Sequence, residues 1–169
     1  MRRDRRLTVI GAGQAAARSI SAMRNAGFDG GITLIGEELH LPYERPPLSK
    51  EMLFGDAEPS APILFDERFY LENDVDLELG RRVKAIDATT GEVWIGSNWR
   101  FRSDRILIAT GSRARLASIA GVEPDRILML RNVDDARRLR SLLTGRRRVV
   151  LVGGGFIGLE IAAGAVRQG

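Results

Sequence analysis

Two glycine-rich turns have the residue types and spacing of a phosphate-binding site. The first, residues 11–13, follows the apolar run 7–10 and precedes an alanine-rich segment. The second, residues 153–158, has the full spacing Gly-x-Gly-x-x-Gly and follows the apolar run 148–152. In a strand–turn–helix unit, such turns bring backbone N–H groups at a helix N-terminus close to the phosphates of a dinucleotide. One turn is a weak signal, but two with the same flanking elements predict two mononucleotide-binding folds.

Three small residues in and just after the first turn have distinct expected roles. Gly11 allows the tight turn, and Gly13 lets a pyrophosphate approach the backbone closely. Ala16 lets the helix pack closely on the strand. These residues predict a dinucleotide site but do not decide which dinucleotide it holds.

Charged side chains near the first turn are candidates for further contacts to the ligand. Glu37 follows the second apolar run, residues 32–35, where dinucleotide folds place the carboxylate that binds ribose hydroxyls. The alternative is that Glu37 is a solvated loop carboxylate. The segment HLPYERPPLSK, residues 40–50, carries Arg45 and Lys50 on irregular chain, and loops held by a scaffold often bear function. A proline-stiffened connection would explain the prolines but not the charges beside them.

The hydrophobic pattern predicts the elements that must position these residues. Strands are predicted at residues 7–10, 32–35, 75–79, 83–87, 93–95, 106–109 and 148–152, with a further piece from Trp99. Helices are predicted at residues 14–26, 48–54, 65–73, 132–143 and 159–167. We expect the strands at residues 75–79, 83–87 and 93–95 and the piece from Trp99 to form a small antiparallel meander inserted as a crossover. The strand at residues 106–109 would return to the first sheet, and Thr110, Gly111 and Ser112 would follow it as a tight turn against the ligand.

The composition excludes some classes of protein. The 169 residues contain no cysteine, which excludes disulfides, thiolate metal sites and a redox-active cysteine pair among them, and no metal site is expected. The net charge of +4 comes mainly from scattered arginines without a nucleic-acid-binding module, so no nucleic-acid partner is expected. Codon bias and a basic face for an acidic partner both remain open as explanations. No run approaches the roughly 20 apolar residues that span a bilayer, so we expect a cytoplasmic protein outside the membrane. The only histidine, His40, is expected to be a surface or packing residue.

Several stretches together resemble the FAD-dependent pyridine nucleotide oxidoreductases. They are VIGAGQAAA, HLPYERPPLSKEML, ILIATGS, MLRNVDDARRL and VVLVGGGFIGLEIA, and they run across essentially the whole chain. The resemblance is greatest to ferredoxin–NAD reductase components of aromatic-ring dioxygenase systems, such as the 3-phenylpropionate system. PYERPPLSK is the most specific of these motifs, since the glycine turns alone indicate only the superfamily.

The resemblance implies a cofactor role for each matching position. Residues expected to bind FAD are Gly11, Gly13, Gln14, Ala15, Ala16, Glu37, Arg45, Pro46, Lys50, Val83, Ala109, Thr110, Gly111 and Arg131. Residues expected to bind NAD are Gly153, Gly155, Ile157, Gly158 and Glu160. Lys50 and Glu160 are the expected catalytic pair, because they match a lysine near the flavin ring and an acidic residue near the nicotinamide. The implied reaction passes electrons from NADH through flavin to a [2Fe–2S] ferredoxin.

The resemblance also predicts the fold class and its division. We expect an α/β chain with a Rossmann-like FAD-binding fold and inserted antiparallel meander in residues 1–113, followed by the first β-α unit of a Rossmann-like NAD-binding fold in residues 114–169. Family members are longer, so this chain alone is expected to be truncated and inactive as a reductase. Its helix at residues 156–166 would expose Phe156, Ile157, Leu159 and Ile161. The alternatives are a rubredoxin reductase, nitrite reductase or NADH oxidase of the same superfamily, and a non-catalytic FAD-binding fragment.

Overall fold

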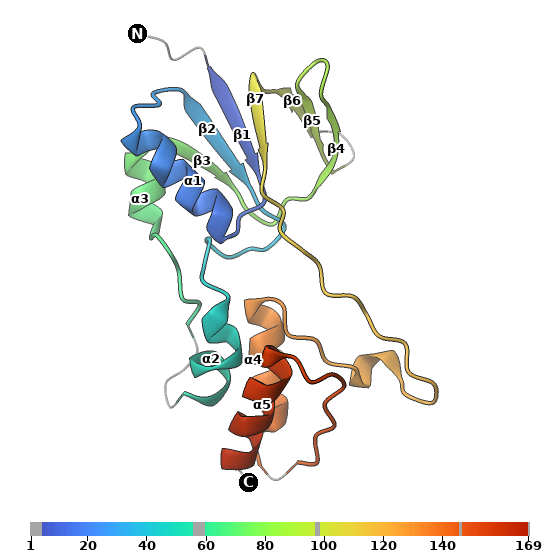
Figure 1. The fold of residues 1–169 in the computed structure, drawn as a ribbon. Helices are drawn as coiled ribbons and strands as arrows, with labels where there is room; N and C mark the ends of the chain where they lie inside the picture. Colours follow the sequence, from blue (N-terminus) through green and yellow to red (C-terminus); the bar gives the residue numbers. More distant parts are fainter. Residues whose placement is uncertain (1–4, 56–59, 97–98, 146, 169) are drawn as a thin grey trace. The chain divides into compact units, whose positions relative to one another are not determined.

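A parallel four-stranded sheet lies at the centre of the first part of the chain (Figure 1). Its strands, in spatial order, are β3 (Val75–Glu78), β2 (Gly31–Ile35), β1 (Arg6–Ile10) and β7 (Arg105–Ile108). All three neighbouring pairs are parallel, with Val9 of β1 opposite Leu34 on one side and Leu107 on the other. These strands are rich in Ile, Leu and Val because both faces of a parallel sheet are covered.

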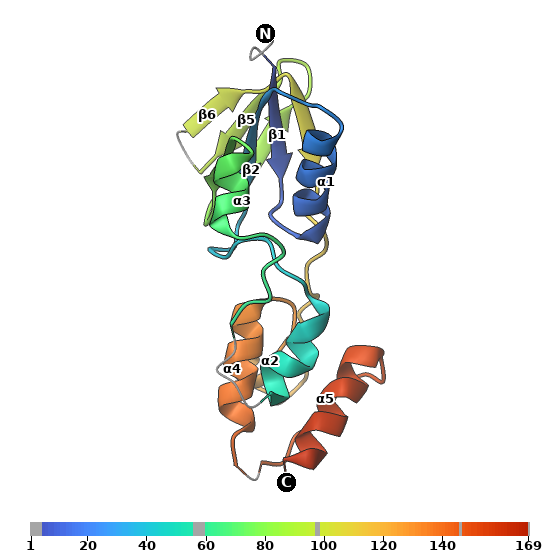
Figure 2. The same cartoon turned by 90° about the vertical axis from the view of Figure 1, so that its left-hand side faces the viewer.

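Two helices, α1 (Gln14–Asn25) and α3 (Glu67–Glu72), cover one face of this sheet, as the turned view in Figure 2 shows. Alternation along β1 directs Val9 to this face, where it packs in one cluster with Ala16 of α1 and Tyr70 of α3. Ala16 has no exposed surface, which confirms the predicted close packing of helix and strand.

An antiparallel sheet of β4 (Val83–Asp87), β5 (Glu92–Ile95) and β6 (Trp99–Arg102) covers the other face. Ile10 and Ile35 of the parallel sheet pack there against Val93 and Ile95. The predicted meander is therefore confirmed for these three strands. The prediction is wrong for the strand from residue 75, because β3 pairs in parallel with β2. Alternating polarity indicates a strand but does not select its partner.

The structure is a computed structural model that describes residues 5–55, 60–96, 99–145 and 147–168. Its contacts divide the chain into two units. The first contains Met1–Tyr43 and Ile63–Gly111, which carry both sheets, and the second contains Glu44–Pro62 and Ser112–Gly169. Within the described residues, no helix is long and apolar enough to cross a membrane.

Tyr70 places a hydroxyl inside the core of the first unit. Its side chain is 1% exposed, and the hydroxyl has no hydrogen-bond partner among the described residues. Burial raises the pKa of the Tyr70 hydroxyl well above its ordinary value, because the anion would lose its hydration. This core therefore contains one polar group that opposes folding rather than supporting it.

We expect Tyr70→Phe to leave the free energy of unfolding at pH 7 unchanged or to raise it by up to about 1 kcal/mol. Because the folded pKa is raised, the unfolded chain loses this proton first once the pH passes about 10, so the parent loses stability there. The variant has no hydroxyl at this position, so it does not lose stability through this ionisation. Urea unfolding of both proteins at pH 7 and at about pH 11 measures the difference. A clear loss of stability at pH 7 would contradict the description of the hydroxyl as unpaired.

The second unit is helical. It contains the 3-10 helix η1 (Pro46–Ser49) and the helices α2 (Glu51–Phe54), α4 (Val133–Leu143) and α5 (Phe156–Arg167), with a second 3-10 helix η2 (Pro124–Arg126). Within this unit α4 packs on α2 and η1, and α5 packs on η1. The predicted cap is confirmed: Asn132 accepts from the Asp135 N–H at 2.7 Å, and the Asp135 carboxylate accepts from the Asn132 N–H at 3.1 Å.

The strand predicted at residues 148–152 is not formed. This run has no regular structure, and the side chains of Val150 and Val152 are 87% and 75% exposed. A strand needs neighbours for its backbone hydrogen bonds, and the described residues of the second unit contain no strand. The predicted tight turn at residues 110–112 is also wrong, since the chain there is irregular.

Candidate functional site

The first glycine turn joins β1 to α1 where the chain leaves the carboxyl end of the parallel sheet. Gly11 has φ +103°, which favours glycine, and its N–H donates to the Ile35 carbonyl at 2.8 Å. A Cβ added to Gly11 would lie 2.3 Å from the carbonyl oxygen of Ala109 and 2.8 Å from the Cα of Thr110. The turn therefore requires glycine for its conformation and for contact with the chain that follows β7.

The N-terminus of α1 is open in a way that fits a phosphate. Gly13 is its N-cap, no side chain caps the helix, and the first turn holds no acidic residue. A Cβ on Gly13 would meet no atom within 4 Å, and Gln14 and Ala15 are exposed. By contrast, Asp66 caps α3 and Asn132 caps α4. The free N–H groups and the positive end of the helix dipole suit the pyrophosphate of FAD.

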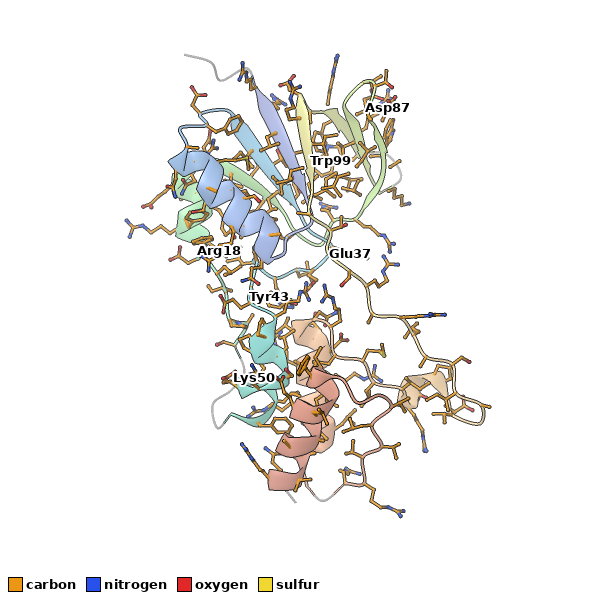
Figure 3. The ribbon with its side chains drawn as sticks, viewed as in Figure 1. Arg18, Glu37, Tyr43, Lys50, Asp87 and Trp99 are labelled. Atoms are coloured by element: carbon orange, nitrogen blue, oxygen red, sulfur yellow. The ribbon has the colours of Figure 1, made fainter. Side chains whose placement is uncertain are left out.

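Glu37, labelled in Figure 3, lies in the loop after β2 and is exposed. Its Oε1 lies 3.2 Å from Nη1 of Arg82, an ion-pair partner that the sequence analysis missed. Val83 follows Arg82 at the start of β4 and packs against the Ile10 core cluster. The only signal in the sequence that indicated Arg82 was its position next to Val83, a predicted FAD-binding residue.

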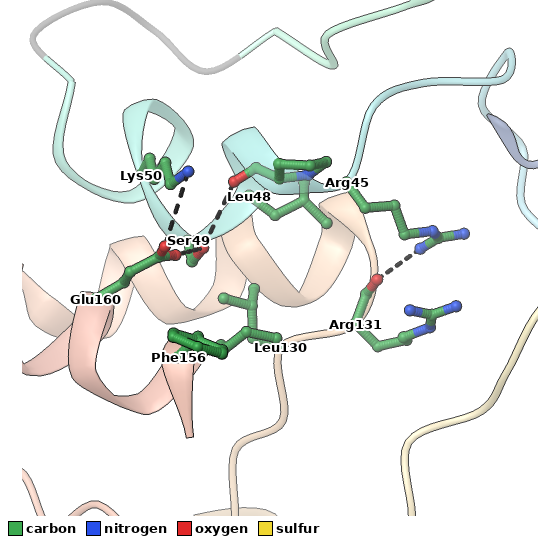
Figure 4. A pocket seen from close by; sticks show the side chains of 10 residues that line it. Arg45, Leu48, Ser49, Lys50, Leu130, Arg131, Phe156 and Glu160 are labelled. Carbon is green, nitrogen blue, oxygen red and sulfur yellow. Dashed lines mark hydrogen bonds and ion pairs between the residues drawn. The ribbon is translucent and has the colours of Figure 1, made fainter. Parts of the chain in front are cut away.

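A cavity of about 300 Å³ lies within the second unit (Figure 4). It is lined by Arg45, Pro46, Leu48, Ser49, Lys50, Leu130, Arg131, Phe156, Ile157 and Glu160. The residues come from η1 and the two residues that flank it, from the chain before α4 and from the start of α5. Six of the predicted site residues, namely Arg45, Pro46, Lys50, Arg131, Ile157 and Glu160, therefore surround one space.

Lys50 and Glu160 form an ion pair in this cavity. Lys50 Nζ lies 3.7 Å from Glu160 Oε1, and the buried Ser49 donates its hydroxyl proton to Glu160 Oε2 (Figure 4). Both carboxylate oxygens are therefore held. The predicted contact between Lys50 and Glu160 is confirmed, whereas Ser49 was missed although it stands next to Lys50.

The local fold places Lys50 between two short helices. The predicted helix at residues 48–54 divides into η1 and α2, and Lys50 lies at the break with φ −119° and ψ −105°. Pro46 begins η1, where its missing N–H costs no hydrogen bond. The Lys50 side chain is half exposed beside the cavity.

Two arginines lie at the other side of the cavity. Arg45 Nη1 donates to the Arg131 carbonyl at 2.5 Å, and Arg131 Nε donates to the Ser112 carbonyl at 2.9 Å. The Arg131 N–H donates to the Asp135 carboxylate at 2.9 Å, which fixes the chain at the start of α4. Guanidinium groups fixed in this way suit an anionic ligand.

The second glycine turn has two features that suit a phosphate. Gly155 caps α5 without a side-chain hydrogen bond and without an acidic residue in the first turn of the helix. A Cβ on Gly153 or Gly155 would meet no atom within 4 Å, whereas one on Gly158 would lie 2.9 Å from the Gly153 carbonyl oxygen. Gly158 thus lets the helix approach the turn closely. The turn and helix fit the pyrophosphate of NAD, although no strand precedes them.

The exposed apolar face expected on α5 is present in part. Phe156, Ile157 and Leu159 are 89%, 52% and 60% exposed, as predicted. The prediction is wrong for Ile161, which is 7% exposed. This residue lies on the side of the helix that packs within the second unit.

The predicted FAD-binding residues are divided between the two units. Those of the first unit are Gly11, Gly13, Gln14, Ala15, Ala16, Glu37, Val83, Ala109, Thr110 and Gly111, and those of the second are Arg45, Pro46, Lys50 and Arg131. Among the described residues there is no cluster of His, Asp or Glu suited to a metal ion.

The sequence matches a known family over nearly its whole length. The model of the pyridine nucleotide-disulphide oxidoreductase family matches residues 5–169. The chain is 41% identical over 167 residues to the 3-phenylpropionate/cinnamic acid dioxygenase ferredoxin–NAD(+) reductase component of Photorhabdus laumondii. The aligned region covers 99% of this chain and 42% of that protein. It is 44% identical over 160 residues to the ferredoxin–NAD(+) reductase component of the p-cumate 2,3-dioxygenase system of Pseudomonas putida, covering 95% and 40%.

A solved structure agrees with these relatives. The covalent putidaredoxin reductase–putidaredoxin complex matches with a TM-score of 0.90 and 31% identity, over 98% of this chain and 40% of that chain. The predicted α/β fold class is confirmed. The chain spans about two fifths of the length of the relatives that it matches. Because the family match extends over residues 5–169, the chain belongs to the pyridine nucleotide-disulphide oxidoreductase family.

Proposed function

We propose that this chain forms the FAD-binding part, residues 1–113, and the beginning of the NAD-binding part, residues 114–169, of a ferredoxin reductase. It would take electrons from NADH and pass them through FAD to a [2Fe–2S] ferredoxin of an aromatic-ring oxygenase system. The names of the relatives at 41% and 44% identity support this assignment. The observation that carries it is the start of α1 after Gly11 and Gly13, where no side chain caps the helix.

The residues of the first unit would hold the adenosine diphosphate end of FAD. The N–H groups at the start of α1 would bind the pyrophosphate, and Glu37 would accept hydrogen bonds from the ribose. Val83 would contact the adenine through its backbone, and Ala109, Thr110 and Gly111 would lie along the cofactor. The open space at Gly13 supports this arrangement, since a phosphate must approach the backbone there.

The residues of the second unit would contact the reactive end. FAD, when bound, supplies hydride acceptance and single-electron transfer, while the protein orients and tunes it. Lys50 would stabilise negative charge on the flavin ring, and Arg45, Pro46 and Arg131 would contact the cofactor. Glu160 would lie near the nicotinamide, with its carboxylate held by Lys50 and Ser49.

The proposed NAD site is the second glycine turn. Gly153, Gly155, Ile157 and Gly158 would bind the pyrophosphate of NADH at the start of α5. The proposed use of NADH favours the cytoplasm as the location, because NADH serves as an electron donor in that compartment.

A second candidate is that this chain binds FAD without catalysing turnover. The unformed strand at residues 148–152 favours it, because the second glycine turn is then not anchored in a sheet. This candidate agrees with the expectation that the chain alone is inactive as a reductase.

Flavin binding and turnover by the 169-residue chain test both candidates. We expect the purified chain to bind FAD in a one-to-one complex, seen as flavin absorbance after gel filtration, and to oxidise NADH with ferricyanide at no more than the rate of free FAD. Failure to bind added FAD would overturn the proposed cofactor site. NADH oxidation at the rate of an intact flavoprotein would contradict the second candidate.

A chimeric protein tests the acceptor. The chain would be joined, at the residue aligned with Gly169, to the remaining segment of the P. putida relative. With NADH as donor, we expect reduction of the [2Fe–2S] ferredoxin of that relative's system to exceed reduction of rubredoxin, nitrite or O₂. A preference for one of the other acceptors would favour the rubredoxin reductase, nitrite reductase or NADH oxidase alternative.

A further inference from the structure

Arg82 makes the contact in the first unit that bears most directly on the proposed ribose site. Its Nη1 lies 3.2 Å from Oε1 of Glu37, which is 45 residues away in the sequence. We propose that Arg82 is a positioning residue for the adenosine end of FAD, which holds Glu37 at the ribose hydroxyls and offsets its charge beside the diphosphate. This inference rests on the proposed FAD site.

Main-chain hydrogen bonds fix the segment that carries Arg82. The Arg81 N–H donates to the Gly36 carbonyl at 2.7 Å, and the Gly80 N–H donates to the Glu38 carbonyl at 3.0 Å. These bonds lie on either side of the ribose-binding carboxylate and hold the two loops together. The ion pair is therefore built on a fixed backbone rather than on the chance meeting of two long side chains.

The loop that carries Glu37 lies against the glycine turn. A Cβ on Gly36 would be 2.5 Å from the Cβ of Ala12, so these two segments touch. A diphosphate at Gly13 and a carboxylate at Glu37 would consequently be neighbours of like charge. The guanidinium of Arg82 reduces that repulsion while leaving the carboxylate ionised to accept hydrogen bonds.

The geometry leaves room for the ribose. The hydrogen bond from Arg82 goes to Oε1, and the Glu37 side chain is still 61% exposed. Its second oxygen can therefore accept hydrogen bonds from the ribose hydroxyls. Without the guanidinium, the carboxylate would turn freely in solvent, and ordering it would oppose binding.

The chain offers a matched control in the neighbouring residue. Arg81 has the same charge, but its Nε lies 3.9 Å from Oε2 of Glu78 and its guanidinium lies 5.9 Å from the centre of the Trp99 ring. Arg81→Met removes one positive charge from this edge of the sheet without removing the partner of Glu37.

The test is calorimetric titration of the 169-residue chain and its variants with FAD and with ADP, which carries the adenosine diphosphate without flavin. We expect Arg82→Met to weaken binding of both ligands about five-fold, Arg82→Lys to weaken it less, and Arg81→Met to change it by less than about two-fold. In the double variant, Arg82→Met should cause little further loss once Glu37→Gln is present. Unchanged thermal unfolding midpoints show that the exposed substitutions leave the fold intact.

The outcomes separate this inference from the proposal on which it rests. A parent chain that binds neither FAD nor ADP would overturn the proposed cofactor site and this inference with it. If the parent binds and Glu37→Gln weakens binding but Arg82→Met does not, only the role of Arg82 is overturned. Equal losses for Arg81→Met and Arg82→Met would replace positioning with general attraction of an anion, and would also overturn it.

Discussion

Gly11→Ala is expected to lower the free energy of unfolding by about 2–5 kcal/mol and to abolish FAD binding. A positive φ costs a residue with a side chain about 1–2 kcal/mol, and Gly11 has φ +103°. The added Cβ would also lie 2.3 Å from the carbonyl oxygen of Ala109. The obstructing atoms are backbone, so relief requires β1 and β7 to separate, and overpacking of this kind costs about 1–3 kcal/mol more. Urea unfolding followed by circular dichroism measures the loss.

Gly13→Ala is the matched control, because the same methyl group is added two residues away. Gly13 has φ −100° and ψ −174°, which any residue adopts, and its Cβ would meet no atom within 4 Å. We expect the free energy of unfolding to stay within about 0.5 kcal/mol of the parent. FAD affinity should fall at least about ten-fold, because the methyl group would occupy the space proposed for the pyrophosphate.

The two variants together separate folding from binding at one turn. Gly11→Ala should lose both, and Gly13→Ala should lose binding alone. A folded Gly11→Ala chain with parental stability would contradict the described contact between the turn and Ala109. A Gly13→Ala chain with parental FAD affinity would place the pyrophosphate elsewhere.

The sequence predicted most elements of the first unit, because the strands of this unit form hydrogen bonds with one another. The run at residues 7–10 and the glycine turn predicted β1 and α1 to within one residue at each end. The strand at residue 75 was predicted as a strand but given the wrong sheet. Its alternating pattern is local, whereas its pairing with β2 depends on a segment about 40 residues earlier in the chain.

The second unit shows where such signals fail. Residues 148–152 have the composition of a buried strand, but hydrogen-bonding neighbours are needed for a strand to form. The composition of a segment therefore indicates that it can form a strand, and whether the strand forms depends on the neighbouring segments.

Site residues with a motif could be predicted, and those defined only by contact could not. Lys50 and Glu160 were placed together through a family resemblance, and they form an ion pair. Ser49 and Arg82 were missed because their partners lie 111 and 45 residues away, and nothing in the type of either residue identifies that partner.

Gly164 should control whether α5 stays attached to the rest of the second unit. It is buried, and a Cβ there would lie 2.1 Å from the ring of Phe54 at the end of α2. Gly164→Leu is expected to lower the local stability of α5 by up to about 2 kcal/mol, because overpacking against the Phe54 ring costs about 1–3 kcal/mol and the gain in helix propensity is only about 1 kcal/mol. Hydrogen exchange of the α5 amides, followed by mass spectrometry, measures this local opening.

Ala163→Leu is the control for this experiment, since it adds a large apolar side chain to the exposed position next to Gly164. Its α5 amides should exchange within about two-fold of the parent rate. Because Glu160 lies one turn earlier on α5, release of the helix by Gly164→Leu should also separate its carboxylate from Lys50 and Ser49. Equal protection of α5 in both variants would show that the helix does not depend on packing against Phe54. The small residue at position 164 would then have no part in holding the Lys50–Glu160 pair.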